Sequence, residues 1–316
     1  MQIIVLDAKP LDAGDLDWGP LEKLGEVIRH DGTPPERANE RIADAEVVYT
    51  NKVRLGAANF AAAKGLKLVS VLATGYDIID LDAARAAGAT VCNVPAYSTE
   101  SVVQTTFALL LELTHGVGAH SAVVHEGAWS ASPTFCFWLQ PLVELAGKTM
   151  AIVGAGNIGR RVAEVAHALG MEVVAADPAA VELPAFVRRV SLEEAFAKAD
   201  VLSMHCPLDE RTRGLVNAER IETMKDGAIL LNAARGPLIE EAAVAAALRS
   251  GKLGGYGTDV LSAEPPAAEN PLLGAPRCVI TPHLAWASRE ARRRLLATSV
   301  GNLRAFLAGT PQNVVS

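Results

Sequence analysis

The sequence predicts an α/β protein built from two doubly wound parallel-sheet domains. Short apolar runs alternate with helical patterns from end to end, and the alternation forms two successive series. Strands that alternate with helices predict parallel sheets that are covered on both faces. With 316 residues, of which 50% are hydrophobic, the chain is long and apolar enough for two domains with a core each.

The first series lies in the N-terminal part of the chain. Helical patterns are expected at 35–45 and 80–88, and a longer one at 98–117 leads into the second series. The expected strands of the first series are 3–7, 26–30, 46–50, 66–72 and 89–94.

The second series repeats this rhythm and includes a helix at 240–252. Its expected strands are 149–154, 171–177, 201–207, 228–234, 256–260 and 278–283. A last helical pattern at 287–309 has no strand left to follow, so we expect it to return to the first domain. The second domain, 99–286, is therefore predicted to be inserted into a domain made of 1–98 and 287–316.

Charge and composition exclude several classes of partner. The formal net charge of −7 gives no electrostatic reason to expect nucleic acid or an anionic membrane. The first residues contain no basic segment typical of a signal peptide, and the apolar run 107–113 is interrupted by Glu112 and too short to span a bilayer. The cysteines are widely separated and contain no CxxC pair, which favours reduced thiols and a cytoplasmic location. They are Cys92, Cys136, Cys206 and Cys278.

The strongest local motif is the stretch 151–178. Gly154, Gly156 and Gly159 fit the pattern GxGxxG between an expected strand and an expected helix. In such a turn the first glycine permits the tight bend, the second lets a pyrophosphate approach the backbone, and the third permits close packing of helix and strand. The free N–H groups at the helix start then bind phosphate. This combination predicts a Rossmann domain that binds a dinucleotide.

Asp177 ends the next strand, eighteen residues after Gly159. A carboxylate there accepts hydrogen bonds from the adenosine ribose and repels a 2′-phosphate. The following residues, 178–180, contain no arginine that could offset this charge. The sequence therefore favours NAD over NADP.

Three further stretches follow expected strands, at the edge where doubly wound folds bind their ligands. They are NAARG (232–236), TDVLSAEPP (258–266) and ITPH (280–283). The side chains in these stretches that could take part in binding or catalysis are those of Arg235, Glu264 and His283. The structural alternatives are a surface ion pair for Arg235, a turn cap for Glu264 and a buried packing role for His283.

Together with the glycine loop, these stretches resemble the D-isomer-specific 2-hydroxyacid dehydrogenase family over nearly the whole chain. The stretches 72–80 (LATGYDIID), 101–112 (SVVQTTFALLLE), 270–273 (NPLL) and 282–288 (PHLAWAS) are most similar to its glycerate dehydrogenase, or hydroxypyruvate reductase, branch. The resemblance implies a flavodoxin-like substrate domain at 1–98 plus 287–316 and an NAD-binding Rossmann domain at 99–286.

The resemblance also implies how the three side chains act in reducing a 2-oxo acid. Arg235 binds the substrate carboxylate with its guanidinium group, which is planar and permanently charged. His283 protonates the developing alkoxide, and in oxidation it takes the proton back. Glu264 orients the imidazole and favours its charged form.

Other positions are assigned through the same resemblance. Thr74 and Gly75 match the loop whose backbone N–H groups bind the substrate carboxylate, although an ordinary strand-to-helix turn is the alternative. Trp286, three residues beyond His283, is expected to line the substrate pocket, and Asp259 to contact the nicotinamide carboxamide, with a strand-end cap as its alternative. Further cofactor contacts are expected at Thr106, Asn157, Ile158, Cys206, Pro207, Thr212 and Ala233. Many relatives carry arginine where this chain has Asn157, which puts a pyrophosphate contact by that side chain in doubt.

The remaining histidines show no spacing typical of a metal site, and no metal is expected. His205 is expected to pack rather than to act in catalysis. The cluster FCFW (135–138) lies in an expected loop, and in similar enzymes this region is near a dimer interface. Trp138 could reach a partner's active site there, or it could serve packing alone. A homodimer joined mainly through the cofactor domains is implied.

We therefore interpret the chain as an NAD-dependent D-2-hydroxyacid dehydrogenase acting on hydroxypyruvate/D-glycerate or glyoxylate. The alternatives within enzymes are D-lactate, branched 2-oxo acids and phosphite. An NAD(H)-sensing corepressor is the alternative among binding proteins, but its peptide cleft and long tails have no evident counterpart here.

Overall fold

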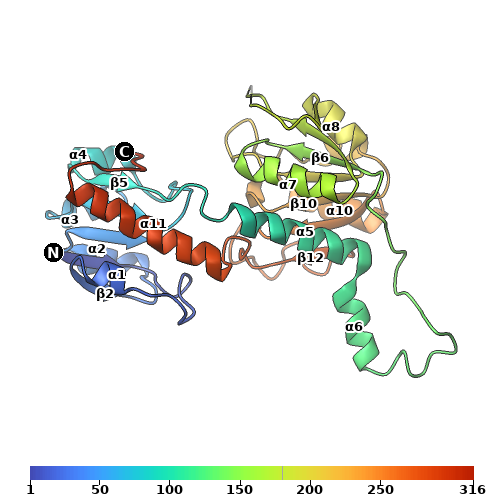
Figure 1. Cartoon of the computed structure of the whole chain (residues 1–316), viewed down its shortest axis with the longest axis horizontal. Helices are drawn as coiled ribbons and strands as arrows, with labels where there is room; N and C mark the ends of the chain where they lie inside the picture. The colour runs from blue at the N-terminus through green and yellow to red at the C-terminus, as the bar shows by residue number, and fades with distance from the viewer. Residues whose placement is uncertain (180) are drawn as a thin grey trace. The chain divides into compact units, whose positions relative to one another are not determined.

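The computed structural model describes residues 1–179 and 181–316 and divides the chain into two compact units (Figure 1). The first unit consists of Met1–Ser98 and Trp286–Ser316, and the second consists of Thr99–Ala285. Trp286 thus belongs to the first unit, one residue away from the expected boundary. Each unit is a parallel sheet with helices on both faces, which confirms the predicted fold class.

The first unit has a five-stranded sheet in the order β2-β1-β3-β4-β5, and all its strands are parallel. The strands are β1 (Gln2–Val5), β2 (Glu26–Arg29), β3 (Val47–Thr50), β4 (Leu68–Val71) and β5 (Thr90–Cys92). Chain order reverses at β1, so the carboxyl ends of β1 and β3 form the switch point where such sheets bind ligands.

Helices cover both faces of this sheet. The short helix α1 (Gly19–Glu22) and the long helix α11 (Arg289–Leu307) lie on one face. Leu295, Leu296 and Leu303 of α11 are buried against that face, because spacings of seven and eight residues keep Leu303 on the same side of the helix as the other two. The other face is covered by α2 (Ala38–Ile42), which follows a 3-10 turn at Pro35–Arg37, and by α3 (Ala57–Ala62) and α4 (Leu81–Ala86).

The second unit has a seven-stranded parallel sheet in the order β12-β11-β10-β9-β6-β7-β8. The strands are β6 (Thr149–Val153), β7 (Glu172–Ala176), β8 (Val187–Arg189), β9 (Val201–Met204), β10 (Ala228–Asn232), β11 (Leu253–Thr258) and β12 (Cys278–Ile280). Its switch point lies between β6 and β9, the arrangement expected for a Rossmann domain.

The register of this sheet defines a single row of residues at its carboxyl edge. Ala176, Val153, Met204, Asn232, Thr258 and Ile280 lie side by side across six strands. The stretches NAARG, TDVLSAEPP and ITPH begin in this row, and Gly154 and Asp177 directly follow it. The sheet therefore brings these motifs, which are far apart in the chain, to one edge.

Helices also cover both faces of the second sheet. The helices α5 (Thr99–His115) and α7 (Asn157–Ala168) pack on one face. The other face is covered by α8 (Leu192–Lys198), α9 (Ala218–Thr223) and α10 (Glu241–Ser250), with a 3-10 turn at Gly236–Leu238.

Two elements of the second unit were not predicted. One is the edge strand β8, and the other is the helix α6 (Val117–His125), which follows α5 after Gly116 and buries none of its residues. We call residues 117–144, which comprise α6 and the loop after it, the arm. Figure 1 shows the arm extending away from the sheet of its own unit.

No single helix within the described residues is long and apolar enough to cross a membrane. The helices α5 and α6 meet the length and composition needed only as a pair, and this pair is bent by 58°.

Candidate active site

The glycine loop after β6 is shaped by two close backbone contacts. Gly154 has a φ of +95°, and a Cβ atom there would lie 2.5 Å from the backbone nitrogen of Cys206. A Cβ atom on Gly159 would lie 2.0 Å from the carbonyl oxygen of Gly154. Both positions therefore require glycine, the first for its backbone conformation and both for space.

Gly156 differs from its two neighbours in the motif. It directly precedes α7, it is exposed, and a Cβ atom there would meet nothing within 4 Å. The space in front of the N-terminus of α7 is therefore open, and the helix dipole favours negative charge there. These features fit the pyrophosphate of a dinucleotide.

Asp177 follows β7 and has a partly buried side chain that faces the glycine loop. One carboxylate oxygen accepts the N–H of Ala155 at 2.6 Å, and the other accepts the N–H of Ala179 at 2.8 Å. A carboxylate has about four acceptor positions, so both oxygens keep capacity for ribose hydroxyls.

The loop after β9 closes the other side of the glycine loop. Burial raises the pKa of the Cys206 thiol to about 11 and lowers the pKa of His205 to about 4. His205 is therefore neutral near pH 7, and its ring lies 2.8 Å from the Ser203 hydroxyl. These properties suit packing rather than proton transfer. The Thr212 hydroxyl donates to the carbonyl of Pro207 at 2.7 Å and so holds this loop closed.

Of the other expected cofactor contacts, Thr106 has a partner inside its own helix. It is 1% exposed, and its hydroxyl donates to the carbonyl of Val102 at 2.8 Å. Ile158 lies in the first turn of α7 and packs against the core, and Asn157 accepts a hydrogen bond from Arg160 at 3.1 Å. Ala233 directly follows β10 at the same edge.

His283 and Glu264 form the one pair of expected catalytic side chains in direct contact. The Nδ1 atom of His283 lies 2.6 Å from one Glu264 carboxylate oxygen. The other carboxylate oxygen accepts the N–H of Leu261 at 3.0 Å, which fixes the direction of the carboxylate. Because an ionised carboxylate only accepts, Nδ1 carries the proton in this pair and Nε2 is left for exchange with a substrate.

Asp259 holds the backbone around His283, a role that the sequence did not reveal. Its carboxylate, in a residue 1% exposed, accepts the N–H groups of Leu284 at 2.9 Å and Ala285 at 2.8 Å and the hydroxyl of Thr281 at 2.6 Å. Burial raises the pKa of this carboxyl above its usual range, against the opposing effect of these donors. Its expected contact with the nicotinamide carboxamide stays a prediction.

Arg235 lies three residues after β10 and is exposed. The buried side chain of Asn232 shapes the turn that presents it, because its amide donates to the carbonyl of Arg235 at 2.9 Å and accepts the N–H of Ala234 at 3.1 Å. The guanidinium makes a hydrogen bond of 2.7 Å with the carbonyl of Ala234.

Gly236 was not singled out in the sequence, yet it joins two parts of the site. A Cβ atom there would lie 2.0 Å from the carbonyl carbon of Leu261. The loop that carries Arg235 is therefore packed directly on the loop that carries Glu264. The stretch NAARG contains Gly236, but it does not indicate which loop this glycine packs against.

The expected carboxylate loop, Thr74 and Gly75, lies in the first unit, after β4. The Thr74 hydroxyl donates to the carbonyl of Val94 at 2.9 Å, and the Asn93 amide donates to the carbonyl of Thr74 at 2.8 Å. These bonds fix the loop from the carboxyl end of the neighbouring strand β5.

Trp286, also in the first unit, is half-buried. Its ring packs edge-on against Tyr97, with 6.4 Å between the ring centroids. The next residue, Ala287, accepts a hydrogen bond of 3.0 Å from the Nε of Arg292 in α11. The segment that carries Trp286 is thus tied to the first turn of that helix.

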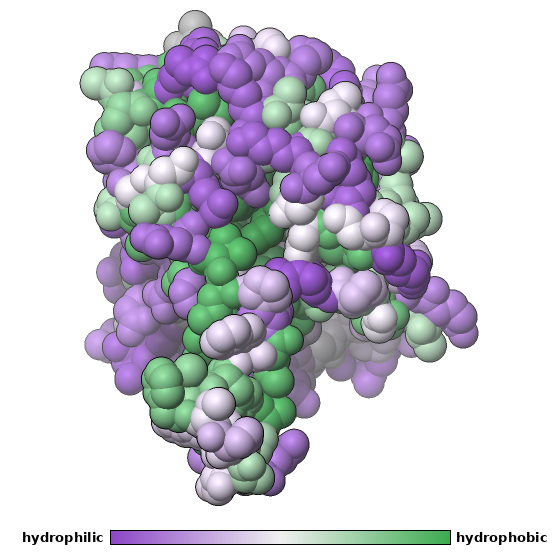
Figure 2. All heavy atoms as spheres, turned by 90° about the vertical axis from the view of Figure 1, so that its right-hand side faces the viewer, coloured by the Kyte–Doolittle hydropathy of each residue, from purple (hydrophilic) through white to green (hydrophobic). Residues whose placement is uncertain are grey.

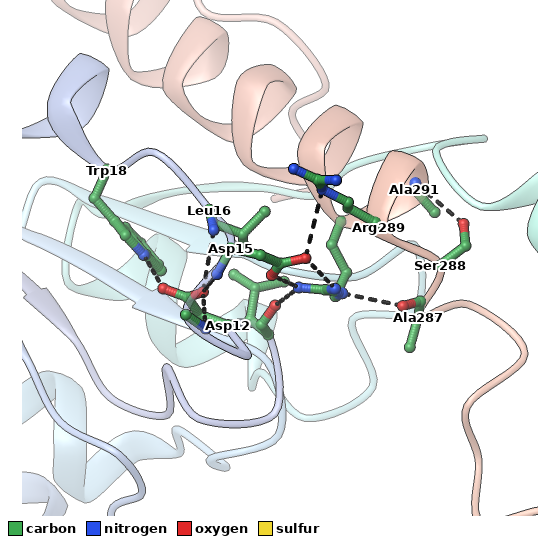
Figure 3. Close-up of polar contacts among 11 residues, drawn as sticks. Asp12, Asp15, Leu16, Trp18, Ala287, Ser288, Arg289 and Ala291 are labelled. Carbon is green, nitrogen blue, oxygen red and sulfur yellow. Dashed lines mark hydrogen bonds and ion pairs between the residues drawn. The ribbon is translucent and has the colours of Figure 1, made fainter.

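Arg292 connects this segment to the loop after β1. Its guanidinium binds the Asp15 carboxylate with two hydrogen bonds of 2.5 and 2.8 Å. Arg292 thereby holds the pKa of Asp15 below its usual range. Asp12 organises the same loop by accepting the N–H groups of Gly14 and Leu16 and the indole N–H of Trp18. Figure 3 shows Asp12 and Asp15 beside the start of α11.

No group of three or more histidine, cysteine or acidic residues that could hold a metal ion occurs within the described residues. All four cysteines are free thiols. The second unit therefore offers a dinucleotide cradle, a histidine–carboxylate pair and an exposed guanidinium at the ends of neighbouring strands. Such a set can bind an anionic substrate and move a proton.

Comparison with known proteins agrees with this chemistry. Residues 107–285 match the family model described as D-isomer specific 2-hydroxyacid dehydrogenase, NAD binding domain. The chain is 49% identical to a hydroxypyruvate reductase of Blautia hydrogenotrophica, with all of both chains covered. It is 38% identical to a glycerate dehydrogenase of Methylorubrum extorquens, over 99% of this chain and 98% of the relative. Among solved structures, an acyclic imino acid reductase in complex with NADPH and D-Arg has a TM-score of 0.86 and 27% identity, with all of both chains covered.

Proposed function

This chain belongs to the D-isomer-specific 2-hydroxyacid dehydrogenase family and is an oxidoreductase, and from this premise we propose that it reduces hydroxypyruvate or glyoxylate with NADH. The observation that carries the proposal is the His283–Glu264 pair at the edge that also holds the glycine loop. The names of the two relatives, hydroxypyruvate reductase and glycerate dehydrogenase, support the choice of substrate.

Each polar group of the second unit has a role in this reaction. A nicotinamide cofactor, when bound, would supply the hydride. Arg235 binds the substrate carboxylate and polarises the adjoining carbonyl group. His283 donates a proton from Nε2 to the substrate oxygen as it gains negative charge, while Glu264 holds Nδ1 and steadies the imidazolium. In the reverse direction His283 accepts this proton.

The second unit binds the cofactor through Gly154, Gly156, Gly159 and Asp177. The backbone N–H groups at Thr74 and Gly75 keep their expected role, which is to bind the substrate carboxylate. Trp286 lines the substrate pocket.

The preference for NAD rests on Asp177. Its carboxylate is fixed by two backbone N–H groups at the end of β7 and carries a negative charge where a 2′-phosphate would lie. We propose a cytoplasmic enzyme, because its four cysteines are free thiols.

The proposed assembly is a homodimer formed through the arm. Figure 2 shows apolar atoms gathered in the projecting lower part of the second unit. Phe135 is 88% exposed and Trp138 is 66% exposed, and large apolar patches of this kind mark interaction surfaces. The other exposed apolar side chains of the arm are Val117, Trp129, Leu139 and Leu142.

A substrate panel tests the proposed reaction. Initial rates with NADH are measured for hydroxypyruvate, glyoxylate, pyruvate and a branched 2-oxo acid, and phosphite is tested with NAD. We expect kcat/KM for hydroxypyruvate or glyoxylate to exceed the others about tenfold or more, which corresponds to roughly 1.4 kcal/mol of transition-state binding. A preference for phosphite or for the branched acid would contradict the proposed substrate class.

The same assay tests the proton donor. We expect His283→Ala to lower kcat by about 10²–10⁴-fold while the Kd for NADH, measured by fluorescence, stays within about twofold, because the imidazole acts in chemistry and not in cofactor binding. His167→Ala, on the exposed side of α7, is the matched control and should leave kcat unchanged. A kcat of His283→Ala close to that of the wild type would remove His283 from the mechanism.

A further inference from the structure

An arginine lies at the cofactor loop although the residues directly after Asp177 contain none. Arg189 is the last residue of β8 and is paired in register with Ala175 of β7. Its guanidinium donates to the carbonyl oxygens of Asp177 at 3.0 Å, Ala179 at 3.1 Å and Val181 at 2.5 Å. One side chain is thus hydrogen-bonded to three carbonyl groups of the loop that follows β7.

The charge of Arg189 is not neutralised by these contacts, because carbonyl oxygens carry no net charge. Among residues 1–179 and 181–316, no acidic side chain forms an ion pair with Arg189. The preceding residue differs, since Arg188 is paired with Glu194 at 2.8 Å. Arg189 is also exposed, so it offers a free positive charge at the surface of the loop.

Asp177 and Arg189 hold the same loop residue from two sides. The Asp177 carboxylate accepts the N–H of Ala179, and Arg189 donates to the carbonyl of Ala179. The negative and the positive group therefore flank one short stretch of backbone. The two cofactors differ at this point, because NADP carries a phosphate where NAD has the 2′-hydroxyl of the ribose.

We propose that Arg189 is a cofactor-selectivity residue that works against Asp177. It orders the loop after β7, and it supplies the positive charge that binds a 2′-phosphate once the Asp177 carboxylate is removed. In the wild type the fixed carboxylate repels the phosphate, so NAD is preferred. This inference rests on the proposed use of NAD and names the second residue that sets the preference.

Equilibrium binding tests the proposal without turnover. The Kd values of NADH and NADPH are measured by fluorescence titration for the wild type and for Asp177→Ala, Asp177→Ala/Arg189→Gln and Asp177→Ala/Arg188→Gln. We expect Asp177→Ala to bind NADPH about tenfold more tightly than the wild type, because a repulsive charge is lost. Adding Arg189→Gln should abolish this gain, because a charged hydrogen-bond donor to phosphate is lost.

Asp177→Ala/Arg188→Gln is the matched control, since it removes a neighbouring arginine that is already paired with Glu194. Its Kd values should equal those of Asp177→Ala. The difference between Asp177→Ala and Asp177→Ala/Arg189→Gln should shrink when salt is raised from about 0.05 to 0.5 M, because the charge of Arg189 is exposed. An effect of loop order alone would not depend on salt.

Three results would overturn the role of Arg189. These are no gain of NADPH affinity in Asp177→Ala, equal NADPH affinity in Asp177→Ala and Asp177→Ala/Arg189→Gln, and a loss in Asp177→Ala/Arg188→Gln equal to that in Asp177→Ala/Arg189→Gln. A wild type that binds NADPH more tightly than NADH would contradict the proposed use of NAD. The comparison of Asp177→Ala with Asp177→Ala/Arg189→Gln would still decide the role of Arg189.

Discussion

At His283 the backbone and the side chain are held by two different carboxylates. Its φ of +53° lies in the left-handed region, which residues other than glycine rarely adopt. Asp259 stabilises this turn by accepting the N–H groups of the two following residues, and the N–H of His283 donates to the Asp259 carbonyl at 2.8 Å. Glu264 then sets the direction of the ring. Strain at a residue that is fixed in this way is common at functional sites.

Replacing Glu264 by glutamine should disable this pair. The Leu261 N–H would hold the amide oxygen, so the amide NH₂ would face Nδ1 of His283 and favour the tautomer that is protonated at Nε2. We expect kcat to fall about a hundredfold or more, as for other histidines that lose their orienting carboxylate. Steady-state kinetics with hydroxypyruvate measures the effect.

Glu241→Gln is the control for the integrity of the loop. Glu241 accepts the N–H of Ser262 at 2.7 Å in the same loop and also binds Asn270. Glu241→Gln should keep kcat within about threefold, because Glu241 binds Ser262 and Asn270 and not the catalytic ring. A kcat within about threefold of the wild type for Glu264→Gln would show that the carboxylate does not orient the catalytic ring.

At the scale of elements, the site is made by loops that leave neighbouring parallel strands. Asn232, Thr258 and Ile280 share one row of the sheet, so the loops after β10, β11 and β12 begin together. Gly236 then packs the first of these loops against the second. The spacing of Arg235 and Glu264 thus depends on a contact between backbones.

Gly236→Ala tests this contact. The added Cβ would lie 2.0 Å from the carbonyl carbon of Leu261 and 2.1 Å from its oxygen, so one of the loops must move. We expect a loss of about 1–3 kcal/mol in the free energy of unfolding, the usual cost of overpacking. Urea unfolding measures this loss. Because both loops carry predicted catalytic residues, kcat should also fall about tenfold or more.

The matched control is Gly32→Ala, where an added Cβ would meet nothing within 4 Å. Its free energy of unfolding should stay within about 0.5 kcal/mol of the wild type. If Gly236→Ala were as stable and as active as Gly32→Ala, the two loops would not need their close contact.

The sequence indicated the elements that have long apolar runs and missed those that do not. The strands around the glycine motif were predicted within a few residues, because each is buried on both faces. The strand β8 has three residues, of which only Val187 is buried, so no periodic pattern marks it. The helix α6 buries none of its residues and therefore shows no apolar stripe.

The same limit applies to the candidate site. The sequence alone identified the candidates Arg235, Glu264 and His283, because each of them lies in a short motif. The partners of Asp259, Gly236 and Arg189 are set by three-dimensional contacts between loops that are distant in the sequence. Arg189 in particular reaches the cofactor loop only because β8 lies beside β7.

At the scale of the whole molecule, the arm is tied to its own unit yet leaves Phe135 and Trp138 exposed. The Leu139 N–H donates to His120 of α6 at 3.0 Å, and the Gln140 amide donates to the carbonyl of Leu113 in α5 at 3.2 Å. Arg277 also binds Gln140 at 2.7 Å. The backbone of the arm is therefore tied to its own unit, while Phe135 and Trp138 stay available to a second copy.

Phe135→Ser/Trp138→Ser should weaken self-association. Aromatic anchors at interfaces contribute about 2 kcal/mol or more each, so we expect the dimer Kd to rise at least about a hundredfold. Sedimentation velocity over a range of protein concentrations measures this change. Leu307→Ser, at an exposed apolar residue at the end of α11, is the control and should remain dimeric. A monomeric wild type, or a double variant as dimeric as Leu307→Ser, would contradict a dimer formed through the arm.

Trp138→Ser alone should raise KM while the dimer persists if Trp138 reaches the partner's site, and an unchanged KM would limit Trp138 to packing.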